Sequence, residues 1–221
     1  EKCLHKIVPA MFDLFVTPLV SVFVTGYLAL AAIGPVFTKL ENSIITGVQA
    51  LITMPYGIGS FIMSGLYAIT VVVGIHHMYT LIDLGQLARY GCTYWLPLAS
   101  AANVAQGGAA LAAALKTRDP KLRSMALPSA LSACMGITEP AIFGVNLRCF
   151  KPFLGGLAGG ACGAWYASIV GLDATGTGVT GIFGILLHLH MPLQYIIMMA
   201  ISFGVSFAVT WIIWKPEEVK A

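Results

Sequence analysis

Three groups of polar residues interrupt otherwise apolar sequence, and they are the candidates for chemistry. They are His76-His77, Asn103 with Gln106, and Thr138-Glu139. Carboxylate, imidazole and amide groups together offer the donors and acceptors that a hydroxyl-rich ligand needs when it leaves water. A carboxylate that accepts from a hydroxyl forms the stronger, charge-assisted kind of bond. The three groups therefore predict a binding site for a sugar.

Glu139 lies in the run MGITEPAIFGVN (135–146), whose flanks are apolar enough to sit at membrane depth. A carboxylate there is costly, so its default interpretation is a substrate or ion site. Gly136, Pro140 and Gly144 are expected to break helical continuity. Irregular backbone at that depth is tolerated only where protein or a water-filled cavity surrounds it. The run predicts a buried acid on a hairpin or re-entrant loop.

Each group also has a structural interpretation. Glu139 would then form an ion pair with Arg148 that locks the loop. The histidine pair would be satisfied by a carbonyl at a helix end, and Asn103 and Gln106 would be hydrogen-bonding links between helices. Which of the two histidines faces a ligand is left open by the sequence.

The remaining polar residues are expected to be structural. Asp13 and Asp83 sit near expected helix ends, where they would be solvated or capping, and His188 and His190 would lie at a membrane face. The sequence contains no pairing of a nucleophile with a base, and its five cysteines have no pair spacing. We therefore expect no catalytic residue, no metal and no cofactor.

Composition indicates an all-α, polytopic membrane protein. The 221 residues are 58% hydrophobic and 10% charged, whereas a soluble domain carries about a quarter charged residues. Several charge-free stretches exceed the roughly 20 residues that cross a bilayer. The net charge of +3 is too small and too dispersed to indicate nucleic acid; membrane lipid is the expected surrounding.

Gly, Pro and charged residues divide the chain into expected elements. Gly34-Pro35 would end the first span, and a short apolar stretch, 43–54, would lie along the surface or form half a hairpin. The segment 78–100 would be interfacial or line a cavity. Five to six helices with one or two half-length hairpins are typical of a broken-helix transporter. The expected spans and packing helices are 7–37, 60–73, 103–115, 152–172 and 192–214.

Charge and aromatic residues indicate the orientation. Four basic residues fall in a short expected loop, 116–123, which the positive-inside rule places on the cytoplasmic side. Trp211 and Trp214 would anchor the last span at the membrane interface.

The run GITEPAIFGVNLR (136–148) closely resembles the substrate-loop motif of the membrane-embedded enzyme IIC of the bacterial phosphoenolpyruvate:sugar phosphotransferase system, glucose–sucrose superfamily. Gly74-Ile75-His76-His77 is similar to the glycine–x–histidine–histidine motif of that family, and the opening, with Pro9, Pro18 and 33–35, is also similar. The run SAANVAQGGA (100–109) resembles the sucrose-specific members most. Trehalose, glucose and β-glucoside permeases are the competing interpretations.

The resemblance implies an elevator-type, homodimeric sugar transporter of the bacterial inner membrane. Glu139 and one of the two histidines would hold the sugar, and Thr138 would assist. A phosphocysteine on a separate IIB domain, charged by IIA, would phosphorylate the sugar. The IIB cysteine motif is absent, and the N-terminal membrane helices of the family are not recognised in the sequence. The resemblance therefore implies the C-terminal portion of enzyme IIC, with a connecting helix and amphipathic stretch in 1–55 and the substrate-transport part in 56–221.

Two other functions are compatible with the same residues. In a proton-coupled secondary transporter, Glu139 and the histidines would relay protons. A sugar sensor, or a phage or bacteriocin receptor, would bind its ligand without flux.

Overall fold

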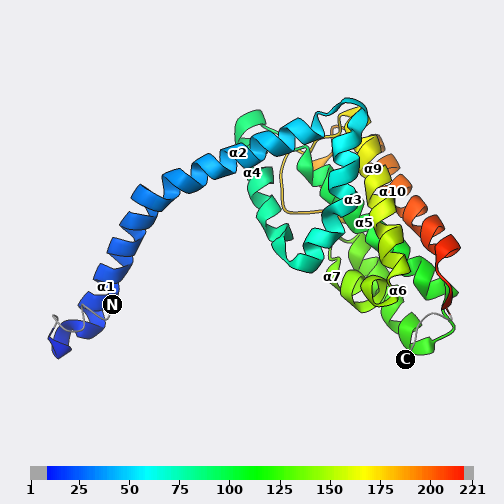
Figure 1. Cartoon of the computed structure of the whole chain (residues 1–221), viewed down its shortest axis with the longest axis horizontal. Helices are drawn as coiled ribbons and strands as arrows, with labels where there is room; N and C mark the ends of the chain where they lie inside the picture. The colour runs from blue at the N-terminus through cyan, green and yellow to red at the C-terminus, as the bar shows by residue number, and fades with distance from the viewer. Residues whose placement is uncertain (1–8, 217–221) are drawn as a thin grey trace. The chain divides into compact units, whose positions relative to one another are not determined.

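The computed structural model describes residues 9–216, in which every named element is helical (Figure 1). The all-α prediction is confirmed. The α-helices are α1 (Ala10–Leu28), α2 (Gly34–Ile52), α3 (Ile58–Val73), α4 (Tyr79–Tyr90), α5 (Trp95–Lys116), α6 (Pro120–Cys134), α7 (Glu139–Ala141), α8 (Leu147–Cys149), α9 (Lys151–Val170) and α10 (Pro192–Ile213). Two π-helical turns are η2 (Ala29–Ile33) and η5 (Ile142–Asn146), and the 3-10 turns are η3 (Pro55–Gly57), η4 (Ile75–Met78) and η6 (Gly181–Leu187).

The chain divides into two compact units, one ending at Ile44 and the other beginning at Ile45. The boundary falls inside α2, because Val48 and Ile52 belong to the core of the second unit. The prediction that Gly34-Pro35 ends a helix is wrong, since α2 begins there and continues to Ile52. Proline has no N–H to donate, and the wider π turn η2 just before it absorbs the irregularity.

Within residues 9–216, four helical stretches are long and apolar enough to cross a membrane: Pro55–Val73, α5, α9 and α10. They match the expected elements at 60–73, 103–115, 152–172 and 192–214, although α5 begins earlier than expected, at Trp95. The expected first span is represented by a shorter apolar stretch, Phe15–Ala31. In the second unit, α3, α5, α9 and α10 lie side by side, with α5 almost wholly buried (Figure 1).

Glycines on α9 allow its neighbours to approach closely. One row faces α10 and the other faces α5, and in both rows an added Cβ would overlap the neighbouring helix. The first row is Gly155, Gly159 and Gly163, and the second is Gly156 and Gly160. Small residues at such contacts let backbones approach within the membrane, where packing replaces the hydrophobic effect as the driving force. The expected packing role of this glycine-rich span is confirmed.

The basic end of the bundle is closed by Lys116. Its ammonium donates to the carbonyls of Trp211 and Trp214 at the end of α10 and lies over the Trp211 ring. Trp214 is wholly buried, so its predicted role as an interfacial anchor is wrong.

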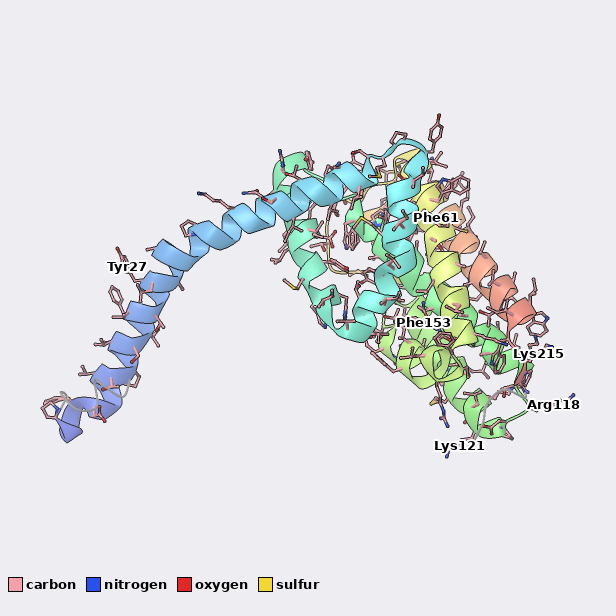
Figure 2. All side chains as sticks on the ribbon, viewed as in Figure 1. Tyr27, Phe61, Arg118, Lys121, Phe153 and Lys215 are labelled. Atoms are coloured by element: carbon pink, nitrogen blue, oxygen red, sulfur yellow. The ribbon has the colours of Figure 1, made fainter. Side chains whose placement is uncertain are left out.

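The expected basic loop is also shorter than predicted, because Asp119 caps α6 by accepting from the backbone N–H of Lys121 at 2.9 Å. Figure 2 shows Arg118, Lys121 and Lys215 at this end.

The glycine contact between α9 and α10 can be tested with a matched pair of substitutions. In Gly159→Ala the new Cβ would lie 2.4 Å from the Ser202 carbonyl oxygen, whereas at the exposed Gly204 of α10 it would meet nothing within 4 Å. We expect Gly159→Ala to cost about 1–3 kcal/mol of stability through overpacking. Gly204→Ala should be neutral or stabilising by about 0.5–1 kcal/mol. Thermal unfolding of the purified full-length protein in detergent measures both; equal melting temperatures would contradict the packing.

Candidate functional site

A break between α6 and α7 presents Glu139. α6 ends at Cys134, and Gly136 follows with φ +101°, a conformation that favours glycine. Ser132 closes the turn: its carbonyl accepts from the Ile137 N–H at 3.0 Å, and its hydroxyl donates to the Ile137 carbonyl at 2.9 Å. The break predicted at Gly136 is confirmed. Pro140 does not break a helix: it lies in the first turn of α7, where a proline is tolerated because its missing N–H is not needed. The break predicted at Gly144 is wrong, because this residue continues the helical path within the π turn η5.

The histidine pair approaches Glu139 from a different part of the chain. α3 ends at Gly74, whose φ of +85° turns the chain into η4, which carries both imidazoles with ring centroids 4.0 Å apart. His76 Nε2 lies 3.8 Å from Glu139 Oε1. Burial, aided by His77 and opposed by Glu139, lowers the pKa of His76 below its ordinary value of 6.5. The imidazole is therefore neutral at pH 7 and can both donate and accept.

Glu139 is more exposed than the sequence predicts. The Glu139 side chain is 49% exposed, so the prediction that this acid is buried is wrong. Glu139 is the first residue of α7, and the neighbouring Thr138 is by contrast 5% exposed. The alternative, in which Glu139 forms an ion pair with Arg148, is also wrong. Among the residues that the structure describes, Glu139 faces the imidazole of His76.

Asn103 and Gln106 lie one turn apart on α5, but they have different partners. Asn103 Nδ2 donates to Thr180 Oγ1 at 2.9 Å. Gln106 is 1% exposed, and its side-chain and backbone oxygens accept from Asn146 Nδ2 at 2.8 and 2.9 Å. The Gln106 amide therefore links α5 to η5, which favours its interpretation as an interhelical contact. Asn103 instead faces the segment that follows α9.

The structure contains a polar cluster around Asp83 that the sequence analysis did not predict. This carboxylate is 5% exposed and accepts from the hydroxyls of Thr93 at 2.6 Å and Thr177 at 3.0 Å. The prediction that Asp83 is solvated or capping is therefore wrong. Burial raises its pKa, against the effect of the two hydrogen bonds. Gln86, one turn along α4 from Asp83, also accepts from Thr93 Oγ1. The i, i+3 spacing of Asp83 and Gln86 is the pattern in the sequence that could have indicated this cluster.

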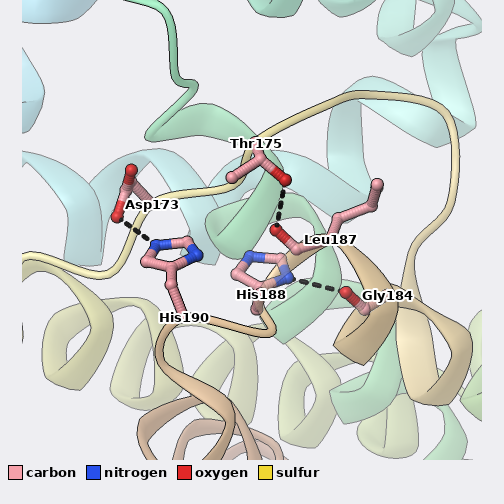
Figure 3. A network of polar contacts seen from close by, with 6 residues as sticks. All are labelled: Asp173, Thr175, Gly184, Leu187, His188 and His190. Atoms are coloured by element: carbon pink, nitrogen blue, oxygen red, sulfur yellow. Dashed lines mark hydrogen bonds and ion pairs between the residues drawn. The ribbon is translucent and has the colours of Figure 1, made fainter.

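His188 and His190 fasten the segment between α9 and α10 (Figure 3). His188 is wholly buried, with Nδ1 2.7 Å from the Gly184 carbonyl and its ring stacked on Tyr195, so its predicted place at a membrane face is wrong. Burial lowers its pKa. His190 Nε2 lies 2.8 Å from Asp173 Oδ1. Both histidines therefore have structural partners within this segment.

A groove of about 650 Å³ lies away from the His76–Glu139 pair. Tyr56, Trp165 and Thr53 are among the residues that line it, at the start of α3. His76 follows the other end of this 16-residue helix, about 24 Å away at 1.5 Å per residue. The groove is mainly apolar and contains none of the predicted site residues. We therefore assign the candidate site to the pair, not to the groove.

The helical bundle and its broken segments define a multi-pass membrane protein, in which an acid and an imidazole from two of the breaks face each other. Residues 1–160 match the family model described as Phosphotransferase system, EIIC. The chain belongs to this family. It is accordingly a multi-pass protein of the bacterial inner membrane and a component of a phosphotransferase-system permease.

The relatives include permeases named for two disaccharides. The sucrose-specific EIIBC component of Salmonella typhimurium is 41% identical over 216 residues, which cover 96% of this chain and 47% of that protein. The sucrose-specific EIIBC component of Bacillus subtilis is 40% identical, covering 99% and 48%. The trehalose-specific EIIBC component of Bacillus subtilis is 33% identical, covering 96% and 45%. The chain spans about half the length of these relatives, and no solved structure matches it.

Because Gln106 has a structural role, we expect the loss of its hydrogen bonds to lower the stability of the protein without weakening ligand binding. Asn146→Leu removes both hydrogen bonds to Gln106 and leaves a buried amide without partners, which should cost about 1–3 kcal/mol of stability. Sugar affinity should change less than about twofold, because this substitution does not touch the His76–Glu139 pair. Thermal unfolding and equilibrium binding of labelled sucrose by the full-length protein measure the two effects. An unchanged melting temperature with lost affinity would instead place Gln106 at the ligand.

Proposed function

We propose that this chain is the sugar-translocating portion of a phosphotransferase-system permease and that sucrose is its substrate. The approach of His76 to Glu139, 3.8 Å apart, is the observation that carries the proposal. These two groups come from separate breaks in the helices, as expected for a site built from broken segments. Relatives named for sucrose at 40–41% identity favour sucrose over trehalose, whose relative is 33% identical. Glucose and β-glucosides remain the other candidates.

The proposed roles follow from the chemistry of each group. Glu139 accepts hydrogen bonds from sugar hydroxyls, and the neutral imidazole of His76 donates or accepts a further bond. We assign His76 to the sugar in preference to His77, because it faces Glu139 and is less exposed. Thr138, which is 5% exposed, and the backbone before Glu139 assist these two groups. Asn103 contributes through its contact with Thr180.

The contribution of this portion to phosphorylation is positioning. A sugar hydroxyl held at the site attacks the phosphorus of a phosphocysteine on the IIB domain; an O–P bond forms, the S–P bond breaks, and the hydroxyl proton is released. Holding the reactants in line supplies much of the catalysis in phosphoryl transfer. IIA recharges IIB, and a homodimer that moves the sugar by an elevator-like motion is the proposed assembly.

A second candidate is a proton-coupled sugar transporter, because a carboxylate and an imidazole in contact can exchange a proton. Uptake of labelled sucrose into cells distinguishes the two functions. The permease requires phosphoenolpyruvate and delivers sucrose phosphate. A proton-coupled transporter loses uptake when an uncoupler is added and delivers free sugar, and that result would overturn the proposal.

Glu139→Gln tests the acceptor. The amide has nearly the same volume but no charge, so we expect at least a tenfold loss of sucrose affinity, which corresponds to about 1.4 kcal/mol, with normal membrane insertion. Asp119→Asn is the matched control: it makes the same change at a helix cap, where asparagine serves equally well. Equilibrium binding to the full-length protein measures both variants, and wild-type affinity in Glu139→Gln would show that this acid is structural.

The lowered pKa of His76 predicts a pH dependence. As pH falls through that pKa, below 6.5, the imidazole becomes cationic and pairs with Glu139, so fewer carboxylate lone pairs remain for the sugar. The dissociation constant should therefore be flat at neutral pH and rise with a midpoint below 6.5. His76→Gln should weaken binding at neutral pH and remove this midpoint, while His77→Gln should keep it. Binding isotherms between pH 8 and pH 5 measure the effect; a midpoint that disappears in His77→Gln would reverse the assignment.

A further inference from the structure

The segment that follows α9, residues 173–181, is bonded to α4 and α5 and lies against the turn that leads to Glu139. Residues 173–180 form no helical turn and Gly181 begins η6, so the polar groups of residues 173–180 are available to bond elsewhere. At its start, Ala174 pairs with Thr93 through two backbone hydrogen bonds of 2.8 and 2.9 Å. Thr175 then bonds to the Leu187 carbonyl through both its N–H and its hydroxyl (Figure 3). The segment is thereby fastened both to the N-terminal end of α5 and to η6.

Asp83 fastens the same segment to the helix that follows the histidine pair. The carboxylate lies on α4, which continues directly from η4 with His76 and His77. One oxygen accepts from Thr93 before α5, and the other accepts from Thr177 within the segment. Because the carboxylate is 5% exposed, water does not compete effectively for these bonds. One buried group therefore joins three parts of the chain.

At its other end the segment lies directly against the turn that leads to Glu139. Thr180 Oγ1 accepts from Asn103 Nδ2 at 2.9 Å. A Cβ on Gly136 would lie only 2.6 Å from this same oxygen, and a Cβ on Gly181 would lie 2.3 Å from the Cys134 carbonyl. Both residues have positive φ, +101° and +67°. Glycine on both sides thus permits a backbone contact closer than any other residue would allow.

The turn from Ser132 to Ile137 is closed by its own two hydrogen bonds, so it can shift mainly as a unit. Glu139 follows this unit immediately at the start of α7. A displacement of the contact at Gly136 would therefore move the carboxylate relative to His76, which is held separately on η4.

We propose that Thr180 is a positioning residue for the sugar site: its hydroxyl, held by Asn103 and braced by the 173–181 segment, sets where the Gly136 turn places Glu139. This inference rests on the proposed function of the His76–Glu139 pair. Thr180 touches neither of those side chains in the contacts described for residues 9–216, so its effect on the sugar is exerted through the backbone of the turn.

The test compares Thr180→Val, Thr180→Ser and Thr53→Val in the full-length permease, with labelled sucrose as the probe. Valine keeps the shape of threonine but removes the acceptor for Asn103, whereas serine keeps the hydroxyl. Thr53 is an exposed residue just after α2, at the opposite end of α3 from the histidine pair, and its hydroxyl donates to the Gln49 carbonyl of α2 at 2.8 Å. We expect the dissociation constant to rise roughly tenfold in Thr180→Val, as for the loss of one buried hydrogen bond. Thr180→Ser and Thr53→Val should bind like the wild type.

Thermal unfolding of the same proteins separates positioning from general destabilisation. The proposal requires affinity to recover in Thr180→Ser, and requires Thr180→Val to bind weakly at temperatures well below its own melting temperature. If Thr180→Val does not fold, Thr180→Ala, which adds no bulk, takes its place under the same criteria. Wild-type affinity in the variant lacking the hydroxyl overturns the inference. The proposed function would survive that result, because it fails only if Glu139→Gln retains affinity or if uptake does not depend on phosphoenolpyruvate.

Discussion

Non-helical backbone inside a membrane-spanning bundle has to find its hydrogen-bond partners within the protein, and this constraint governs the structure around the candidate site. Water is scarce at that depth, so each unsatisfied N–H or C=O costs several kcal/mol. The broken segments meet the requirement by bonding locally and to one another: Ile137 bonds back to Ser132, and Ala174 pairs with Thr93. Asn103 then joins α5 to Thr180. The site is thus built on a connected polar interior.

Close packing of the helices makes that interior possible. Two rows of glycine on α9 bring α5 and α10 close to it, and Gly108 on α5 lets α10 approach α5. Side-chain hydroxyls can then bond to backbone carbonyls of the next helix, as Ser206 does to Ala105 at 2.5 Å. Ser64 bonds to the carbonyls of Leu98 and Gly160 in the same way. With α5 held from several sides, Asn103 has a fixed position from which to orient Thr180. The small residues of the spans and the polar residues of the breaks therefore act together.

The sequence predicts features that depend on local chemistry and fails where partners are distant. Gly136 interrupts the helix through its own backbone conformation, and Pro140 suits the first turn of the helix that follows, so the loop before Glu139 was predictable. Pro35 fails as a stop because a π turn accommodates it. The burial of Asp83 depends on Thr177, 94 residues away, and the role of Thr180 depends on Asn103, 77 residues away. The backbone carbonyl of Trp214 likewise accepts from Lys116, 98 residues earlier. No local pattern encodes those pairings.

The exposure of Glu139 changes how the proposed binding of sugar hydroxyls by its carboxylate has to be explained. A buried carboxylate would bind hydroxyls because it has already lost its water. A carboxylate that is 49% exposed keeps that water until the sugar displaces it, so the sugar gains only if its hydroxyls meet an acceptor already in the correct position. Preorganisation then matters more than burial. It resides in groups that do not touch the sugar: the closed turn at Ser132, the contact of Gly136 with Thr180, and the braces from Asp83. Under the proposed function, selectivity for the sugar is accordingly a property of the backbone framework as much as of the side chains of Glu139 and His76.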